Sequence, residues 1–360
     1  MNILFDYRMK DWSGIGRYSS NLVDNLNNIS INNKLFLLSN SQKTNETNFK
    51  NIICNSDVFS ISEQLELPIL NSKGKFDLFH SPHFVFPIFN FKKLVLTIHD
   101  LTPLLFPEYF SKIARLYMKW MIWLAKFKAN KIIAVSENTK QDLINKFGID
   151  KGKIAVVYNG VDVSYEIINN QTRLSQVKEK YETGQEYILY VGNVKPHKNI
   201  SRLLKAFSMV NRNSKLIIVG KRNKVYDEVH KIIKEYQLKD KVVFTEFVPD
   251  EDLLLLYNAA TVFVYPSLYE GFGLPPLEAM ACGTPVITSN VSSLPEVVGD
   301  AAITIDPYDI DELVNEINNV ISNPKLQQKL SRKGLNRAKK FTWRKAAEET
   351  LKVYEEVLQE

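Results

Sequence analysis

Two carboxylates and two glycines lie close together in residues 265–278, where an apolar run is followed by a loop and a short helical pattern. Glu270 directly precedes Gly271, Gly273 follows two residues later, and Glu278 lies in the helical pattern that comes next. Glycines let a backbone approach a ligand closely, and the exposed N–H groups at the start of a helix favour an anion. The segment therefore has the residue types that suit a phosphate-bearing ligand.

A carboxylate only accepts hydrogen bonds, so an acid beside an anion site suits ligand hydroxyls. Two acids that flank such a loop suggest a ligand with both phosphates and hydroxyls, as in a nucleotide sugar. A plainer alternative makes Glu270 a surface residue and lets Glu278 stabilise the expected helix over residues 276–282 through its dipole. Spacing alone leaves both interpretations open, because short motifs have many false matches.

Further polar residues follow expected strands. Gly16 and Arg17 lie in a Gly-Ile-Gly-Arg sequence that opens a helical pattern near the N-terminus. His99 and Asp100 follow an apolar run, and Lys198 lies in a loop after another. Each has a plain alternative, because spaced glycines often form tight turns, a lone histidine is often structural, and a loop lysine is often solvated.

Short apolar runs alternate with helical patterns through most of the chain. Many runs are apolar throughout, as in strands that are buried on both faces of a parallel sheet. We expect strands at residues 34–38, 94–98, 131–135, 154–157, 187–191, 215–219, 242–245, 262–265, 285–288 and 302–305. The alternation predicts an α/β fold with doubly wound parallel sheets, whose ligands bind where strands turn into helices.

The chain has 360 residues, which favours two domains. The strand–helix alternation breaks once, after the turn signal Asn159-Gly160, where a polar stretch begins. We therefore expect an N-terminal domain over residues 1–165, a linker over 166–184 and a C-terminal domain over 185–342. A final helix over 343–360 is expected to pack back on the N-terminal domain.

Composition excludes several classes of protein. Hydrophobic residues make up 45% and charged residues 24%, which is ordinary for a globular chain. The two cysteines cannot build a disulfide framework, and no cluster has the spacing of metal ligands. We find no signal-peptide pattern and no apolar run of membrane-span length, so we expect a cytoplasmic protein.

Six landmarks carry a resemblance to a known family. They are Gly14-Ile15-Gly16-Arg17, Thr97-Ile98-His99-Asp100, Val135-Ser136-Glu137, Tyr158-Asn159-Gly160-Val161-Asp162, Val191-Gly192 with Lys198-Asn199, and Glu270 through Glu278. In this order they resemble the family-four retaining glycosyltransferases, and most closely bacterial mannosyltransferases of surface polysaccharide synthesis. The resemblance covers essentially the whole chain. It implies the GT-B fold, in which two Rossmann-like lobes face an inter-domain cleft, with the acceptor on the N-terminal lobe and the nucleotide sugar on the C-terminal lobe.

The resemblance also implies roles for single residues. The implied catalytic residues are His99, Glu270 and Lys198, of which Lys198 would neutralise the leaving diphosphate. The implied donor-binding residues are Gly16, Asn193, Lys198, Arg222, Gly271, Phe272, Gly273, Leu274 and Glu278. Arg17 and Asp100 are implied near the acceptor or a phosphate. The sequence departs from many relatives at Asn193, where they have arginine, and Arg222 or Lys221 would replace that cation.

The implied reaction is the transfer of a hexose with retention of anomeric configuration. GDP-mannose is the favoured donor, and the acceptor is a glycan or a polyprenyl-diphosphate-linked oligosaccharide. No metal ion or other cofactor is expected, because basic side chains and helix N–H groups would neutralise the diphosphate. The alternatives are a UDP-sugar-dependent transferase, a phosphorylase or epimerase on similar lobes, and a non-catalytic nucleotide-sugar-binding protein.

Residues 109–136 hold no acidic side chain. They contain the basic residues Lys112, Arg115, Lys119, Lys126, Lys128 and Lys131. A basic amphipathic helix with tryptophan suits an anionic membrane, which would place the protein at the inner face of the cytoplasmic membrane through residues 112–131. The alternative is a helix packed on the N-terminal sheet with a solvated basic face. Nucleic acid explains the charge less well, because no recognised binding motif accompanies it.

Overall fold

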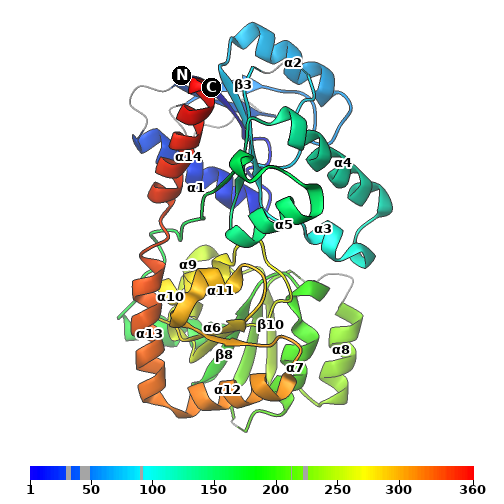
Figure 1. Cartoon of the computed structure of the whole chain (residues 1–360). Helices are drawn as coiled ribbons and strands as arrows, with labels where there is room; N and C mark the ends of the chain where they lie inside the picture. Colours follow the sequence, from blue (N-terminus) through cyan, green and yellow to red (C-terminus); the bar gives the residue numbers. More distant parts are fainter. Residues whose placement is uncertain (30–33, 41–48, 90–91, 212, 222–225) are drawn as a thin grey trace. The chain divides into compact units, whose positions relative to one another are not determined.

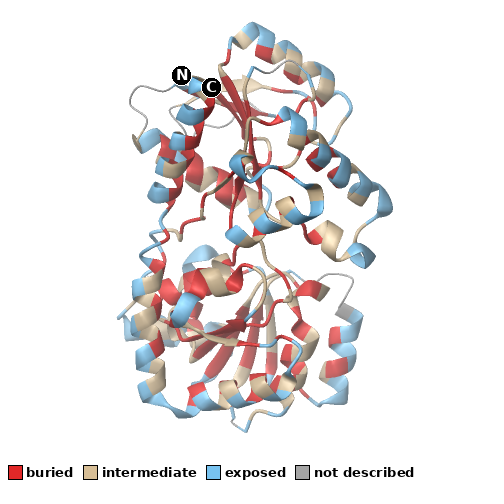
Figure 2. Cartoon of the chain, viewed as in Figure 1, coloured by how far each residue is buried: buried red, intermediate tan, exposed pale blue. Residues whose placement is uncertain are grey.

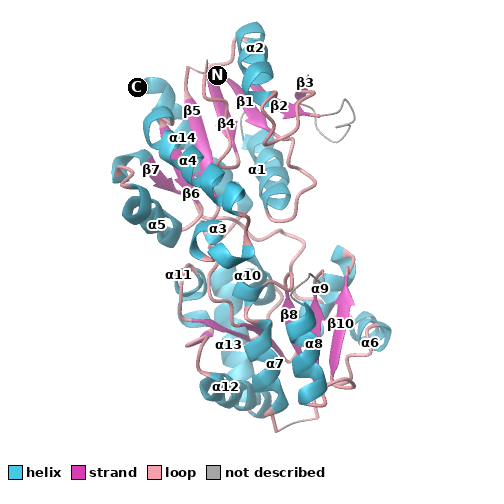
Figure 3. Cartoon of the chain, turned by 90° about the vertical axis from the view of Figure 1, so that its right-hand side faces the viewer, coloured by secondary structure: helices cyan, strands magenta, loops and turns pink. Residues whose placement is uncertain are grey.

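The computed structural model describes residues 1–29, 34–40, 49–89, 92–211, 213–221 and 226–360. The chain divides into two compact units (Figure 1). Met1–Gly160 together with Trp343–Glu360 forms the N-terminal unit, and Val161–Thr342 forms the C-terminal unit. In each unit helices cover a layer of strands (Figure 3).

The N-terminal unit is built on a parallel sheet with seven strands among the described residues, in the order β3-β2-β1-β4-β5-β6-β7. The strands are β1 (Asn2–Asp6), β2 (Lys34–Ser39), β3 (Lys50–Ile53), β4 (Leu78–Ser81), β5 (Leu94–Ile98), β6 (Lys131–Ala134) and β7 (Ile154–Val156). The helices are α1 (Ile15–Ile29), α2 (Glu63–Gly74), α3 (Thr102–Leu105), α4 (Lys112–Lys128), α5 (Glu137–Phe147) and α14 (Trp343–Gln359).

Both faces of this sheet are buried. Successive side chains of a strand point to opposite faces, so one strand contributes to two cores. Ile3 and Phe5 of β1 belong to the core that includes residues of α1 and α14, whereas Leu4 belongs to the core that includes Met121 and Ile122 of α4. Figure 2 shows the buried residues along the strands and on the sides of the helices that face them. Two apolar faces explain why the expected strands are apolar throughout.

Helix α14 returns to the N-terminal unit and packs against α1 (Figure 1). Its Tyr354 hydroxyl lies 2.5 Å from Nδ1 of His80 at the end of β4. The other ring nitrogen of His80 lies 2.8 Å from the Thr97 hydroxyl of β5. A buried polar chain therefore joins the last helix to the centre of the sheet, where an unpaired group would be costly.

The C-terminal unit is built on a second parallel sheet, with six strands among the described residues in the order β10-β9-β8-β11-β12-β13. The strands are β8 (Tyr187–Val191), β9 (Lys215–Val219), β10 (Val242–Glu246), β11 (Val262–Tyr265), β12 (Val286–Ser289) and β13 (Ile303–Ile305). The helices are α6 (Gln171–Lys180), α7 (Ile200–Ser208), α8 (Tyr226–Glu235), α9 (Asp250–Ala259), α10 (Leu274–Ala281), α11 (Leu294–Val298), α12 (Ile310–Ser322) and α13 (Pro324–Ala338).

The segment 166–184 differs from the linker that we expected, because it contains α6 and belongs to the C-terminal unit. Asn170 caps α6 by accepting a hydrogen bond from the Arg173 N–H at 3.1 Å. Val177 is buried, and the Tyr181 hydroxyl donates to Asp252 of α9 at 2.7 Å. One cap, one buried side chain and a few polar contacts hold this helix, so its sequence carries little apolar pattern.

Candidate active site

The C-terminal sheet has a topological switch between β8 and β11. From β8 the strands continue through β9 and β10 on one side, and the chain then returns to β11 on the other side. The loops that follow β8 and β11 therefore diverge at the carboxyl edge of the sheet, which is where open α/β sheets bind ligands. Lys198 lies in the first loop and Glu270 in the second.

Lys198 and Glu270 form a close ion pair between these loops. The Lys198 Nζ lies 2.5 Å from Oε1 and 2.7 Å from Oε2 of Glu270, and 2.9 Å from the Tyr265 hydroxyl. The two charged side chains are only 15% and 12% exposed, so water screens the pair incompletely. The Tyr265 ring also lies 5.4 Å from Nζ and stacks on Tyr190. Two of the three predicted catalytic residues thus meet at one point.

The environment keeps Glu270 charged. Burial acts to raise the pKa of its carboxyl, but the charge and hydrogen bonds of Lys198, together with Ser267 and His197, outweigh burial and lower the pKa. Glu270 is therefore an anion at neutral pH, and Lys198 is its counter-charge. A phosphate arriving at this edge would meet a cation whose position is already fixed.

Asn199 holds the backbone beside Lys198. It is buried and has a left-handed φ of 62°, a conformation that asparagine tolerates better than most residues. Its Nδ2 donates to the carbonyl oxygens of Pro266 and Pro307 at 3.0 and 2.7 Å. These bonds tie the loop after β8 to the loop after β11 and so help to fix the position of Lys198 relative to Glu270.

The backbone of the Glu270 loop is held by the turn before α11. The Glu270 N–H donates to the Ser292 hydroxyl at 3.0 Å, and the Ser293 hydroxyl lies 2.9 and 2.8 Å from the carbonyl oxygens of Glu270 and Phe272. Gly273 has a φ of +112°, and a Cβ there would lie 2.8 Å from a methyl group of Leu294. The loop is therefore a rigid one that requires glycine at 273.

The predicted donor-binding residues 271–274 directly follow Glu270 in the sequence and differ in how far they are exposed. Phe272 and Gly273 are buried, whereas Gly271 and Leu274 are half-buried. Leu274 begins α10, two residues before the start that we expected, because Pro275 fits the first turn of a helix.

Glu278 lies inside α10 and is 3% exposed. Its Oε2 accepts a hydrogen bond from the Tyr257 hydroxyl of α9 at 3.0 Å. Burial, and after it the charge of Glu270, raises the pKa of the nearby Tyr265 hydroxyl well above its usual value. The Tyr257 hydrogen bond helps to hold the Glu278 carboxylate in place.

The loops that follow β8 and β9 touch through their backbones. Gly220 has a φ of +151°, and a Cβ there would lie 2.1 Å from the carbonyl oxygen of Gly192. Asn193, a predicted donor-binding residue, is half-buried in this loop. Arg222, which we expected to supply a cation here, lies outside the described residues, and Lys221 is exposed.

The N-terminal sheet has its own switch between β1 and β4, and Gly16 and Arg17 follow β1 there. The Gly16 N–H donates to the Trp12 carbonyl at 2.8 Å, and a Cβ at Gly16 would lie 2.1 Å from the Lys10 carbonyl oxygen. The loop itself therefore requires this glycine, and a contact with diphosphate stays a prediction. Arg17 is half-buried on α1.

His99 and Asp100 follow β5 at the same edge of the N-terminal sheet. The His99 Nε2 lies 2.9 Å from the Pro82 carbonyl, and its ring packs edge-on against Tyr18. Burial lowers the pKa of His99, so its imidazole is neutral at pH 7. Asp100 accepts a hydrogen bond from the Thr102 N–H at 2.8 Å, which supports the start of α3.

Several residues that hold the site have no role assigned from the sequence. Asn199 belongs to one of the six landmarks and Tyr265 opens the 265–278 segment, so their positions are a usable signal. Ser292 and Ser293 lie beyond the next strand, and Tyr257 lies in a preceding helix. Nothing in the spacing of these last three residues indicates the site.

Among the residues that the structure describes, no group of three or more His, Cys, Asp or Glu side chains could hold a metal ion. The expected independence from metal stays a prediction. Within the same described ranges, no helix has both the length and the apolar character needed to cross a membrane.

Chains built of two doubly wound units are known among solved structures. HepE of Anabaena, solved in complex with UDP and glucose, superposes with a TM-score of 0.82 at 20% identity, over 99% of this chain and 100% of that one. WaaG, a glycosyltransferase involved in lipopolysaccharide biosynthesis, superposes with a TM-score of 0.77 at 14% identity, over 98% and 99%. The predicted GT-B fold is confirmed.

Sequence comparison then identifies the family. The model described as Glycosyltransferase Family 4 matches residues 13–165, and that described as Glycosyl transferases group 1 matches residues 171–337. The chain is 35% identical to O-antigen chain mannosyltransferase B of Escherichia coli over 77% of this chain and 74% of that protein. It is 32% identical to O-antigen chain mannosyltransferase RfbU of Salmonella typhimurium over 72% and 69%. The chain belongs to the family-four glycosyltransferases.

Proposed function

We propose that the chain is a retaining glycosyltransferase that moves mannose from GDP-mannose to a glycan or a polyprenyl-diphosphate-linked acceptor. The observation that carries the proposal is the Lys198–Glu270 pair at the switch point, in the same unit as the buried Glu278. Support for mannose comes from the two O-antigen mannosyltransferases that the chain resembles. In this proposal the C-terminal unit binds the donor and the N-terminal unit binds the acceptor.

The donor is held through its diols and its diphosphate. Glu278 accepts hydrogen bonds from the ribose hydroxyls, and Tyr257 keeps its carboxylate in place. Lys198 and the backbone N–H groups of residues 271–273 bind the diphosphate, with Asn193 beside them. Glu270 hydrogen-bonds the sugar hydroxyls, which a carboxylate held as an anion does well.

In the reaction, the bond between the anomeric carbon and the β-phosphate oxygen breaks, and GDP leaves with the electron pair. Lys198 stabilises the charge that develops on this oxygen. The acceptor hydroxyl oxygen bonds to the anomeric carbon on the face that GDP leaves, and its proton passes to the departing phosphate. The neutral His99 imidazole, whose Nε2–H donates to the Pro82 carbonyl, accepts a hydrogen bond from a sugar hydroxyl at Nδ1 without adding charge.

The test is to incubate the protein with GDP-mannose or UDP-glucose and to follow the sugar by proton NMR. The proposal predicts that GDP-mannose is consumed and that the first product has the α configuration of the donor. A first product with the β configuration would refute retention. Preferential consumption of UDP-glucose would favour the UDP-sugar alternative, and tight nucleotide binding without turnover would favour a binding protein.

We also propose that α4 places the protein at the inner face of the cytoplasmic membrane. Met118, Met121, Ile122 and Ala125 of α4 are buried in the N-terminal core, which satisfies the need of the helix for packing. The α4 stripe remains outside: it consists of Ile113, Leu116, Trp120, Trp123 and Phe127, which are 46–82% exposed. Its members are spaced alternately by three and four residues, so they follow one line along the helix.

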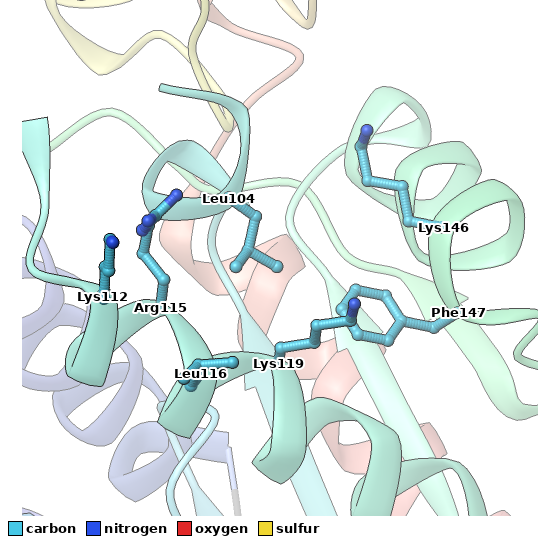
Figure 4. Close-up of a pocket in the computed structure, with 7 residues that line it drawn as sticks. All are labelled: Leu104, Lys112, Arg115, Leu116, Lys119, Lys146 and Phe147. Atoms are coloured by element: carbon cyan, nitrogen blue, oxygen red, sulfur yellow. The ribbon is translucent and has the colours of Figure 1, made fainter. Parts of the chain in front are cut away.

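Basic side chains flank the α4 stripe. Figure 4 shows Lys112, Arg115 and Lys119 of α4 and Lys146 of α5 around a hollow of about 500 Å³ that is also lined by Leu104, Leu116 and Phe147. Cations beside exposed tryptophan and phenylalanine match an interface of anionic headgroups and acyl chains. A lipid-linked acceptor would reach the protein at such a surface.

A further inference from the structure

We propose that a cluster of aromatic rings on the N-terminal unit binds a sugar ring of the acceptor glycan. The ring cluster consists of Trp12, Phe59, His83, Phe84 and Tyr117. The inference rests on the proposed function, because it assumes that the acceptor is a saccharide, and it assigns residues that neither the motifs nor the family resemblance single out.

The ring cluster lies at the edge where the N-terminal sheet is expected to bind a ligand. Trp12 is in the loop after β1, and His83 and Phe84 are in the loop after β4. Strands β1 and β4 are neighbours at the topological switch of this sheet. Phe59 comes from the loop after β3 and Tyr117 from α4, so four separate segments converge on this edge.

The rings contact one another in a continuous arrangement. Trp12 and Phe59 stack with centroids 5.7 Å apart and planes 24° apart. The His83 ring lies edge-on to both, at 6.4 and 5.4 Å, and 3.9 Å from Phe84. Tyr117 lies 6.1 Å from Phe59. The stacked Trp12–Phe59 pair and the edge-on contacts of His83 have favourable geometries for aromatic pairs, so the cluster is organised without a ligand.

Two of these rings are nevertheless left in solvent. Trp12 is 42% exposed and Phe59 is 43% exposed. A stacked pair of large rings on a surface is an apolar platform that water covers poorly. A sugar ring presents C–H groups on one face and hydroxyls at its rim, so it covers such a platform while its hydroxyls reach polar neighbours.

His83 supplies a polar neighbour. It is 9% exposed, and its Nδ1 is buried with no hydrogen-bond partner among the residues that the structure describes. Burial lowers the pKa of His83 to about 3, so the imidazole is neutral. An orphaned ring nitrogen costs stability, and a sugar hydroxyl would satisfy it.

The backbone of Phe59 is held in a strained conformation. Its φ is 70°, which is uncommon for a bulky side chain. Four residues further on, the buried Glu63 at the start of α2 has its Oε2 3.1 Å from Arg8, and Arg8 is paired in turn with Asp6. This buried ion network anchors the end of the loop that carries Phe59, and backbone strain of this kind concentrates at ligand sites.

The test compares Trp12→Ala and Trp12→Phe with the wild type. Calorimetric titration with α-linked mannobiose should show about tenfold weaker binding for Trp12→Ala and a smaller loss for Trp12→Phe, which keeps a ring. Phe247→Ala is the matched control, because Phe247 is a 75% exposed ring on the C-terminal unit. In transfer assays with the same disaccharide, Trp12→Ala should raise the KM for the acceptor and leave the KM for GDP-mannose unchanged.

The outcomes separate this inference from the proposed function. Equal mannobiose binding by the wild type, Trp12→Ala and Phe59→Ala would overturn the sugar site, even if GDP-mannose is consumed. The same holds if the wild type binds no mannobiose, or if Phe247→Ala loses as much affinity as Trp12→Ala. If the wild type consumes no nucleotide sugar but binds mannobiose in a Trp12-dependent way, the proposed function fails and the sugar site stands.

Discussion

Replacing Lys198 by methionine tests the charge arrangement of the candidate active site. The substitution keeps an unbranched side chain and removes the cation, which leaves the Glu270 carboxylate at 12% exposure without its partner. Loss of one member of a buried ion pair costs about 3–5 kcal/mol. Because both side chains retain some exposure, we expect the lower end, about 3 kcal/mol of unfolding free energy in the C-terminal unit.

The loss should depend on pH with a defined sign. In the wild type the pKa of Glu270 is lowered, so its pairing stabilises the fold above the ordinary carboxyl pKa, and this contribution disappears as the pH falls through the lowered value. In Lys198→Met the largest influence that lowers the pKa of Glu270 is lost, so this pKa is higher than in the wild type, although Ser267 and His197 still oppose burial. The variant therefore loses most stability near neutral pH and approaches the wild type as acid protonates Glu270.

Hydrogen exchange of β8 and β11 is the assay, because these strands carry the two loops. The chain provides an internal control: its four tryptophans, Trp12, Trp120, Trp123 and Trp343, all lie in the N-terminal unit. Tryptophan fluorescence should therefore report the same unfolding midpoint for the variant and the wild type. Lys195→Met, in the same loop, should leave exchange unchanged.

Lys198→Met should also weaken GDP binding about 30-fold, as expected for losing a hydrogen bond between two charged groups. Unchanged protection of β8 and β11 at neutral pH, or a loss that grows in acid, would refute the reasoning about the pair.

Three further predictions concern other parts of the molecule. Gly220→Ala should destabilise the C-terminal unit by about 2 kcal/mol, measured by hydrogen exchange of β9, because its Cβ would meet the Gly192 carbonyl at 2.1 Å; unchanged exchange would contradict this contact. The N-terminal unit should lose stability as the pH falls from 6.5 to about 3, because burial lowers the pKa of His80 and His83 to about 3 while both take up protons in the unfolded chain. Each histidine should cost up to about 1.4 kcal/mol per pH unit. An unfolding midpoint, measured by tryptophan fluorescence, that does not change over this range would contradict the prediction. Trp120→Asp in the α4 stripe should reduce binding to phosphatidylglycerol vesicles at least about tenfold in a sedimentation assay and leave GDP-mannose hydrolysis unchanged. Phe247→Asp is the control, and equal vesicle binding by Trp120→Asp and the wild type would exclude the stripe as the membrane surface.

The central strands could be predicted from the sequence because each is apolar on both faces. Strands β5, β8, β9 and β11 have the predicted limits. Helix α6 could not be predicted, because most of its residues are polar and Val177 is its one buried residue. A helix that is held by a cap and surface contacts leaves no hydrophobic period to recognise.

Helix α4 shows a second limit of sequence patterns. Its apolar residues cover more than one face, and periodicity does not tell which face packs on the sheet. The structure buries Met118 and Met121 and leaves Trp120 exposed. Only the position of the neighbouring elements decides between these faces.

Only part of the candidate active site could be predicted from the sequence. The residue types at Glu270 and Glu278 indicated phosphate and hydroxyl chemistry, but the pairing of Lys198 with Glu270 joins positions 72 residues apart. That contact follows from the order of strands in the sheet, which places β8 beside β11. Spacing along the chain carries no information about it.

Release of GDP from GDP-mannose by the wild type and by Glu270→Gln tests the central claim most directly. Glu251→Gln is the matched control, because Glu251 is an exposed carboxylate of the same unit. The account predicts turnover by the wild type and by Glu251→Gln, and a loss of at least about 100-fold for Glu270→Gln, which keeps the shape of the side chain and removes its charge. Turnover by Glu270→Gln at the wild-type rate, or no consumption of GDP-mannose by the wild type, would contradict the account.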